Sequence, residues 1–127
     1  MTFKTGFDAS LAHRMMAGAD IFLMPSLYEP CGLTQMYALK YGTVPVVRGT
    51  GGLEDTVSSF DPSTGRGNGF KFYVYEKNVF LESFHQALNI FKDPSTWKKL
   101  MQNGMKTDFS WDRSAKEYVD IYKTIRK

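Results

Sequence analysis

Residues 19–57 read ADIFLMPSLYEPCGLTQMYALKYGTVPVVRGTGGLEDTV, and this stretch decides the fold that we expect. The short apolar run at residues 21–24 is typical of a strand buried on both faces, and Pro25 ends it because a central strand needs every backbone N–H. A second β-branched run at residues 44–47 predicts another strand. Apolar residues at helical spacing predict an amphipathic helix over residues 33–41 between the strands. This order predicts a parallel βαβ unit within an α/β fold.

The predicted helix ends at a glycine, which supports its placement. Its apolar residues recur every three or four positions, and they are Leu33, Met36, Tyr37 and Tyr41. Gly42 then stands where the residue after a helix often needs a positive φ, a conformation that glycine adopts without a steric penalty.

The turn after the first strand carries the candidate site. In an open parallel sheet, ligands bind beyond the carboxyl ends of the strands, where this turn and the glycine-rich turn after the second strand both lie. The residues that start the helix have N–H groups without intrahelical partners, and the positive end of the helix dipole adds to their attraction for an anion. These residues are Cys31, Gly32, Leu33 and Thr34.

Glu29 stands beside this anion-binding turn. Its carboxylate would repel phosphate but could accept hydrogen bonds from the hydroxyl groups of a sugar or a ribose. A site that favours phosphate at one place and hydroxyls at another suits a nucleotide-sugar. The alternative, about equally compatible with the spacing, is that Glu29 only caps the helix and Gly32 only permits a turn.

The segments on either side of residues 19–57 predict further elements. Residues 3–7 are expected to form a short strand, and Asp8 or Ser10 to cap a helix that Gly18 closes. Residues 54–57 are predicted to begin a short helix or turn. Residues 61–69 are turn-rich and predict a surface loop.

The carboxyl-terminal part predicts a final strand and three helices. The alternating run at residues 70–74 is typical of a strand. Asn78 is expected to cap the first helix, Asp93-Pro94 to start the second and Ser110 to precede the third. The third helix carries an aromatic and aliphatic stripe that we interpret as core and not as a carbohydrate platform. The stripe consists of Ala115, Tyr118, Val119, Tyr122 and Ile125.

Composition limits the class of protein. With 127 residues, 43% of them hydrophobic and 15% aromatic, the chain is expected to fold as one domain with a packed core. No segment reaches the roughly 18 consecutive apolar residues of a membrane span, and no signal peptide is recognisable. The single cysteine excludes an internal disulfide, and no His or Cys partners at ligand spacing predict a metal site.

The net charge of +3 does not predict nucleic-acid binding. The first 60 residues carry four basic and five acidic side chains, and the remainder carries twelve and eight. The basic excess is scattered among acids over the predicted helices, which is typical of a solvated surface. We therefore expect neither a nucleic-acid nor a membrane partner.

The sequence EPCGLTQMYALKYGTVPVV, followed by TGGLEDTV, closely resembles the C-terminal domain of bacterial glycogen synthases and plant starch synthases. The resemblance extends over essentially the whole chain through Gly6-Phe7, Ala19-Asp20, residues 67–70 and residues 108–111. These enzymes are retaining glucosyltransferases of the GT-B fold that transfer glucose from ADP-glucose or UDP-glucose to an α-1,4-glucan. The resemblance implies a Rossmann-like parallel sheet flanked by helices, corresponding to the second half of a GT-B C-terminal domain.

The resemblance also implies roles for particular residues. Glu29 would face the donor glucose and help to stabilise an oxocarbenium-like transition state. Phe7 would stack on the nucleotide base, and simple core packing of Phe7 is an equally compatible alternative. The donor phosphates and sugar would be held by residues that lie in the two turns. These are Cys31, Gly32, Leu33 and Thr34 in the first turn, and Thr50, Gly51 and Gly52 in the second. The chemistry requires no metal and no cofactor besides the donor substrate.

Residues 1–127 would then be a single, partial C-terminal nucleotide-sugar-binding domain. The N-terminal GT-B domain and the basic residues that neutralise the donor diphosphate have no counterpart in the sequence, so we expect no turnover by the isolated chain. In whole enzymes of this family the last helix crosses back to the other domain, so part of its stripe is expected to be exposed here. An exposed sheet edge could support homo-oligomerisation. The family implies a cytoplasmic location, or a plastid if the source is a plant. The alternative is a non-catalytic nucleotide- or glucan-binding module that reuses the fold.

Overall fold

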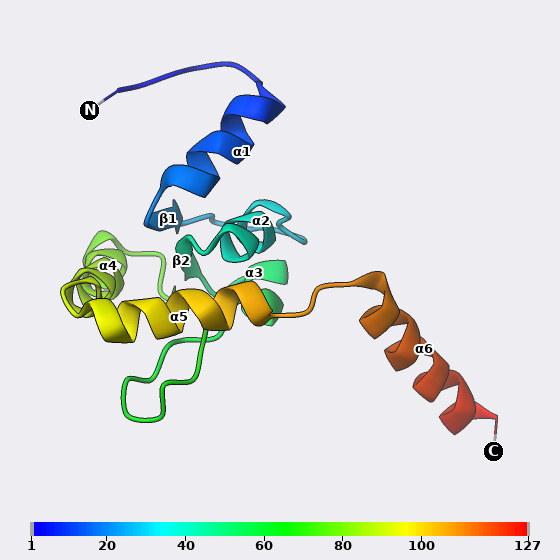
Figure 1. Cartoon of the computed structure of the whole chain (residues 1–127). Helices are drawn as coiled ribbons and strands as arrows, with labels where there is room; N and C mark the ends of the chain where they lie inside the picture. Colours follow the sequence, from blue (N-terminus) through cyan, green and yellow to red (C-terminus); the bar gives the residue numbers. More distant parts are fainter. Residues whose placement is uncertain (1, 127) are drawn as a thin grey trace.

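A computed structural model describes residues 2–126 of the chain, and a three-stranded parallel sheet lies at its centre (Figure 1). The strands are β1 (Ile21–Met24), β2 (Val44–Arg48) and β3 (Phe70–Phe72), in the order β1-β2-β3. Ile21 is paired with Val44, and Val46 with Phe70. The predicted α/β class and the parallel βαβ unit are confirmed.

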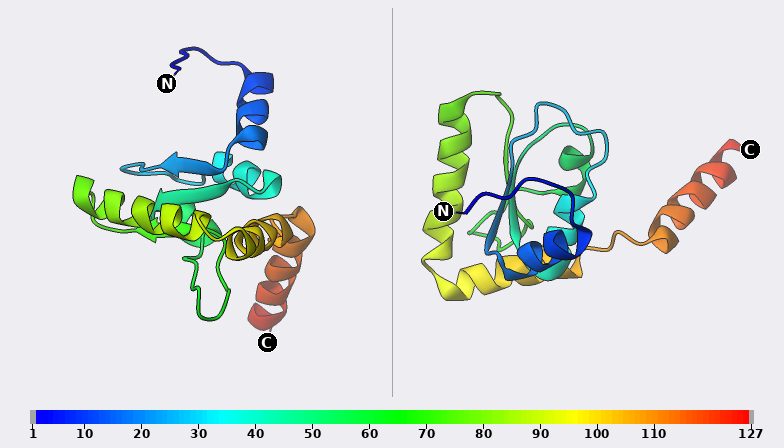
Figure 2. Two further views of the ribbon diagram at one scale, coloured as in Figure 1. Left: turned by 60° about the vertical axis from the view of Figure 1, so that its left-hand side comes forward. Right: turned by 90° about the horizontal axis from the view of Figure 1, so that it is seen from above.

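Six helices complete the described residues. They are α1 (Ala9–Gly18), α2 (Thr34–Tyr41), α3 (Gly52–Thr56), α4 (Lys77–Phe91), α5 (Pro94–Lys106) and α6 (Trp111–Ile125). Figure 2 shows α1 and α6 projecting from the layers formed by the sheet and the other helices. Residues 61–69 form the predicted loop without a helix or a named strand.

The core lies on both faces of β2. On one face Val44 and Val46 pack with residues of α4 and α5, among them Ala87, Trp97 and Leu100. On the other face Val47 packs with Leu53 of α3 and with Val57. Because β2 is the central strand and its first four residues are all buried, it anchors the layers.

Local signals for helix ends are largely confirmed. Asp8 caps α1 by accepting a hydrogen bond from the Leu11 amide, and Asp93 caps α5 with Pro94 in the first turn. Ser110 accepts from the Arg113 amide at the start of α6. Gly42 ends α2 with φ of 84° and donates its N–H to the last turn of the helix. These predictions succeed because each involves groups only a few residues apart.

Three predictions about the elements are wrong. Residues 3–7 form no strand. α4 begins at Lys77, so Asn78 lies inside the helix, and Glu76 at the cap position makes no side-chain bond. β1 is not buried on both faces, since Leu23 is 43% exposed. β1 is an edge strand among the described residues, and an edge position leaves its outer side uncovered.

The buried face of α2 also differs from the predicted one. The helix buries Gln35, Ala38 and Leu39, whereas Leu33 and Tyr41 are exposed. The predicted apolar residues and the observed buried residues both recur at helical spacing. The prediction chose the apolar residues because glutamine is polar and therefore scores as exposed. Leu39 packs against Gly104 of α5, where an added Cβ would lie 2.8 Å from a Leu39 methyl group.

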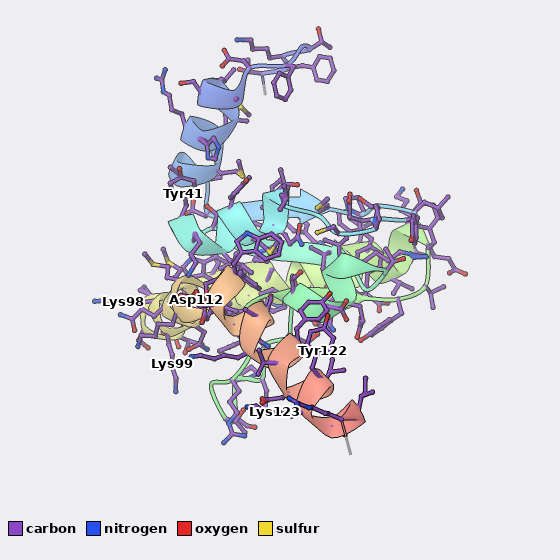
Figure 3. The ribbon with its side chains drawn as sticks, turned by 90° about the vertical axis from the view of Figure 1, so that its right-hand side faces the viewer. Tyr41, Lys98, Lys99, Asp112, Tyr122 and Lys123 are labelled. Carbon is purple, nitrogen blue, oxygen red and sulfur yellow. The ribbon has the colours of Figure 1, made fainter. Side chains whose placement is uncertain are left out.

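The interpretation of the α6 stripe as core is wrong, whereas the exposure that the family resemblance implied for part of the stripe is observed. No residue of α6 is buried in the described structure, and Tyr122 and Ile125 are 67% and 74% exposed. Figure 3 shows α6 extending below the sheet, with Tyr122 and Lys123 on the extending part. An amphipathic pattern reports that a face can be buried, and here no element of the described chain covers it.

Candidate functional site

The first candidate turn connects β1 to α2 at the carboxyl edge of the sheet. Pro25 follows β1 immediately, so the strand stops there. Gly32 has φ of 70°, a left-handed conformation that L side chains rarely adopt, and it turns the chain into the helix. Leu33 occupies the cap position of α2 and offers no side-chain hydrogen bond. The backbone amides at this helix start are therefore not capped by a side chain.

The amides of the first turn have no protein acceptor within residues 2–126. The first hydrogen bond of the helix runs from the Tyr37 amide to the Leu33 carbonyl oxygen, at 3.0 Å. None of the hydrogen bonds in the described chain is donated by the backbone amide of residues 31–34. These amides lie at the positive end of the α2 dipole, and this arrangement can hold an anion.

The second candidate turn lies in backbone contact with the first. The Gly52 amide donates to the Glu29 carbonyl oxygen at 3.1 Å. A Cβ added to Gly51 would lie 2.0 Å from the same oxygen, and one added to Gly52 would lie 1.9 Å from the Cys31 carbonyl oxygen. Only glycine fits at either position, because real Cβ atoms do not approach this closely.

This contact changes what the second turn can offer a ligand. The Gly52 amide is used by Glu29 within the protein, so it is not free to bind phosphate in this conformation. Within the described chain, the amides of Thr50 and Gly51 donate no hydrogen bond. Backbone contacts from this turn are therefore restricted to these two residues.

Two side chains that sequence reasoning did not select connect the turns. Gln35 is completely buried, and its Nε2 donates to the Cys31 carbonyl oxygen at 3.2 Å and to Thr56 Oγ1 at 2.9 Å. Thr56 Oγ1 in turn donates to the Gly52 carbonyl oxygen at 2.6 Å. The sequence signal that could have identified Gln35 is its helical spacing from Ala38 and Leu39. A polar side chain on a buried helix face needs hydrogen-bond partners nearby.

Glu29 is half-buried beside both turns. Its carbonyl oxygen is held by Gly52, whereas its carboxylate takes part in no hydrogen bond or ion pair of the described chain. The backbone is thus fixed while the side chain stays available to a ligand. A carboxylate in this state can accept hydrogen bonds from hydroxyl groups.

A cavity of about 480 Å³ opens next to the helix start. Cys31, Leu33 and Gly52 line it, whereas Glu29 is not among its lining residues. Its other wall comes from residues 108–111 and the first turns of α6, including Arg113 and Glu117, which are paired with each other at 3.1 Å. The cavity therefore joins three predicted residues to a segment that the sequence did not link to them.

An acidic residue on that wall has a shifted pKa. A hydrogen bond from the Ser110 amide, at 2.8 Å, lowers the pKa of Asp108 below its usual value. The Ser110 hydroxyl, Lys40 and Arg113 lower it further. Asp108 is therefore charged at neutral pH, and its role in the structure is to hold the segment that leads into α6.

Phe7 is separate from the other predicted residues. It is 97% exposed and lies before α1. The cavity that it lines is formed entirely by residues 2–15. In the described chain, the structure brings the two turns together and leaves Phe7 outside this group.

The described residues contain neither a cluster of metal-ligating side chains nor a helix able to span a membrane. Among residues 2–126, His, Cys, Asp and Glu side chains form no group of three or more that could hold a metal ion. Over the same range, every helix is too short or too polar to cross a membrane.

Comparison with known proteins relates this geometry to a family. The family model described as glycosyl transferases group 1 matches residues 2–106. A glycogen synthase from Koribacter versatilis is 54% identical over 124 residues, which cover 98% of this chain and 26% of that protein. A glycogen synthase from Thermotoga maritima is 55% identical over 118 residues, or 92% of this chain and 24% of that protein.

Solved structures show the same relationship. The catalytic domain of starch synthase IV from Arabidopsis thaliana, bound to ADP and acarbose, matches with a TM-score of 0.83 and 40% identity over 94% of this chain and 25% of that chain. A sucrose-phosphate synthase from Thermosynechococcus elongatus, 24% identical, has the same fold, with a TM-score of 0.70 over 98% of this chain and 30% of that chain. The chain spans about a quarter of the length of the glycogen synthases it matches.

Proposed function

This chain belongs to the group 1 glycosyl transferase family, and we propose that it forms the donor-binding part of a glucosyltransferase of the glycogen and starch synthase type. The substrates would be ADP-glucose or UDP-glucose as donor and an α-1,4-glucan as acceptor. The chain matches glycogen synthases over nearly its full length, which supports this choice of substrate class.

One observation carries the proposal. The amides of residues 31–34 have no acceptor within the described chain, they lie at the start of α2, and the half-buried Glu29 precedes them. Such a site combines donors for an anion with a carboxylate for hydroxyl groups. A nucleoside diphosphate joined to a hexose presents both chemical groups in one molecule.

The proposed mechanism divides the work between these groups. As the bond between C1 of glucose and the diphosphate breaks, the electron pair leaves with the diphosphate and positive charge develops on the sugar ring. The amides of Cys31, Gly32, Leu33 and Thr34 would stabilise the departing diphosphate, and the Glu29 carboxylate would stabilise the ring. Dipoles that are already oriented before reaction provide a large share of such stabilisation. The acceptor hydroxyl oxygen then forms the new bond to C1 and loses its proton to the departing diphosphate.

The other predicted residues have secondary roles in this proposal. Thr50 and Gly51 would contact the donor through their free amides, whereas Gly52 would act by holding the Glu29 backbone. Phe7, which is exposed, would stack on the nucleotide base. The reaction would use no metal and no cofactor besides the donor.

The proposal includes partners for the chain. An upstream segment would supply the basic residues for the diphosphate, and an N-terminal GT-B domain would supply the acceptor surface, so the 127-residue chain alone would not elongate glucan. The outer edge of β1 could pair with that domain's polypeptide or with a second copy. The compartment would be the cytoplasm, or a plastid in a plant.

Calorimetry on the 127-residue chain tests the proposal. We expect weak binding of ADP-glucose or UDP-glucose, and at least about tenfold weaker binding by Glu29→Ala, because a hydrogen bond to a charged group contributes about 1.5–3 kcal/mol. Glu82→Ala removes an exposed carboxylate of α4 and should bind like the wild type.

Other results would contradict the proposal. Binding of maltooligosaccharides without any donor binding would favour a non-catalytic glucan-binding module. Glucan elongation by the purified 127-residue chain would show that no second domain is needed.

A further inference from the structure

We propose that Gln35 is a positioning residue whose side-chain amide sets the spacing between the two turns of the donor site. The inference rests on the proposed function, because the spacing matters only if a donor contacts both turns. It concerns the hydrogen bonds beneath the site and names a residue that does not itself touch the donor.

A continuous series of hydrogen bonds leads from one turn to the other. Gln35 Nε2 donates to the carbonyl oxygen of Cys31 in the first turn and to the hydroxyl of Thr56. The same hydroxyl donates to the carbonyl oxygen of Gly52 in the second turn. Nε2 provides two hydrogens and the hydroxyl one, so every hydrogen in this series has an acceptor.

The Gln35 amide is oriented so that its NH2 group bonds to the Cys31 carbonyl oxygen and to Thr56, while its own oxygen stays without a partner. Gln35 Oε1 is buried and has no hydrogen-bond partner among the described residues. Reversing the amide would place Oε1 against the Cys31 carbonyl oxygen, and two acceptors repel each other. An unpaired buried oxygen is unfavourable. Its presence here indicates that the donor end of the amide is the part the site requires.

The amide head of Gln35 also occupies the space under Gly32. A Cβ added to Gly32 would lie 2.4 Å from Oε1 and 2.9 Å from Nε2. Gly51 and Gly52 approach the carbonyl oxygens of Glu29 and Cys31 so closely that no side chain fits at either glycine. The first turn is therefore in contact with both the Gln35 head and the second turn, and a change in either would move its free amides.

This arrangement has a functional consequence for donor binding. Groups that contact one ligand at several points must be held near their final positions before the ligand arrives, within about 0.5 Å. Because Gln35 and Thr56 connect the carbonyl groups of both turns, removing one hydroxyl or amide should weaken donor binding by separating the turns. It should not abolish the fold, since the sheet core lies elsewhere.

An NMR titration of the 127-residue chain with ADP-glucose tests the inference. In the wild type we expect the amides of Cys31 and Gly51 to shift together with one dissociation constant. In Thr56→Val, which lacks the hydroxyl, we expect about fivefold weaker binding and loss of the joint response, since a net hydrogen bond contributes about this factor. Thr56→Ser keeps the hydroxyl and should restore binding to within about twofold.

A second variant removes the Gln35 amide, which is the first donor in the same series of hydrogen bonds. Gln35→Met has a similar length but no donor, so it should reproduce the weaker binding and the separate responses of Thr56→Val. Thermal unfolding of each variant separates this effect from loss of structure. If Gln35→Met does not fold, the comparison between Thr56→Val and Thr56→Ser decides alone.

The possible outcomes distinguish the two proposals. Absence of any shift in the wild type, both with ADP-glucose and in a second titration with UDP-glucose, overturns the proposed function and the positioning role with it. Wild-type binding with an unchanged affinity and joint response in Thr56→Val overturns only the positioning role. Equal weakening by Thr56→Val and Thr56→Ser also overturns it, because the hydroxyl would then not be the cause.

Discussion

The helices α2 and α6 differ in how well their amphipathic sequence patterns match the residues that they bury. α2, which starts at the first turn, has a weak amphipathic pattern but buries Gln35, Ala38 and Leu39. α6 has a much stronger pattern and buries no residue in the described structure. The comparison teaches that amphipathicity identifies a face able to pack, whereas burial depends on whether another element is present to cover it.

The difference extends to polar groups. At the turns, buried polar atoms are joined to the backbone, as the two bonds from Gln35 Nε2 illustrate. On α6, the pair between Arg113 and Glu117 is more than half exposed at both side chains, so it contributes little to stability. Stability should therefore be concentrated around the sheet and the turns.

The largest expected effect is on the free energy of unfolding, and it contrasts a buried leucine of α2 with an exposed isoleucine of α6. Leu39→Ala should lower the free energy of unfolding by about 2–5 kcal/mol, because it leaves a cavity at a 1% exposed position. Ile125→Ala on α6 should change it by less than about 0.5 kcal/mol, since the side chain is 74% exposed. Urea unfolding measures both values. A large loss for Ile125→Ala would show that α6 is covered in solution.

A smaller effect is expected at the contact between the turns. Gly52→Ala should cost about 1–3 kcal/mol of unfolding free energy, because its Cβ would meet the Cys31 carbonyl oxygen at 1.9 Å and force the two backbones apart. Gly18→Ala, where an added Cβ meets nothing within 4 Å, is the matched control and should change stability little. Chemical denaturation measures the stability of both variants. Equal stability of Gly52→Ala and Gly18→Ala would contradict the close approach of Gly52 to the Cys31 carbonyl oxygen.

The smallest expected effect is on tryptophan fluorescence, not on stability. The chain has two tryptophans, of which Trp97 is 5% exposed in α5 and Trp111 is 88% exposed at the start of α6. In Trp97→Phe, the remaining Trp111 should emit at longer wavelength and be quenched readily by iodide. In Trp111→Phe, the remaining Trp97 should be quenched weakly. Similar quenching in the two variants would mean that the start of α6 is buried in solution.

The sequence allowed prediction of most of the fold that positions the site. The apolar runs of β1 and β2, the glycine that ends α2 and the caps of α5 and α6 are confirmed. The start of α4 was missed because Asn78 is a good capping residue by type, yet the helix begins one residue before it. A local signal of this kind gives only a preference for where a helix begins.

For the candidate site, the sequence placed the two turns at one edge of the sheet. It did not predict that Gly52 uses its amide within the protein, because that bond joins residues 23 positions apart in the chain. Nor did it select Gln35 and Thr56, whose hydrogen bond spans 21 positions. Such contacts depend on how α2 and α3 and the turns that precede them approach each other, and no pattern within either segment encodes their separation.

The sequence by itself determined the class of fold, the family and the residues able to turn the chain or end a helix. These properties depend on local sterics and on hydrogen bonds between near neighbours. Only the tertiary structure decided which face of α2 is buried, which amides of the turns remain free, and that α6 has an uncovered stripe. Those properties depend on which surfaces meet, and a chain's own periodicity cannot specify the element that covers it.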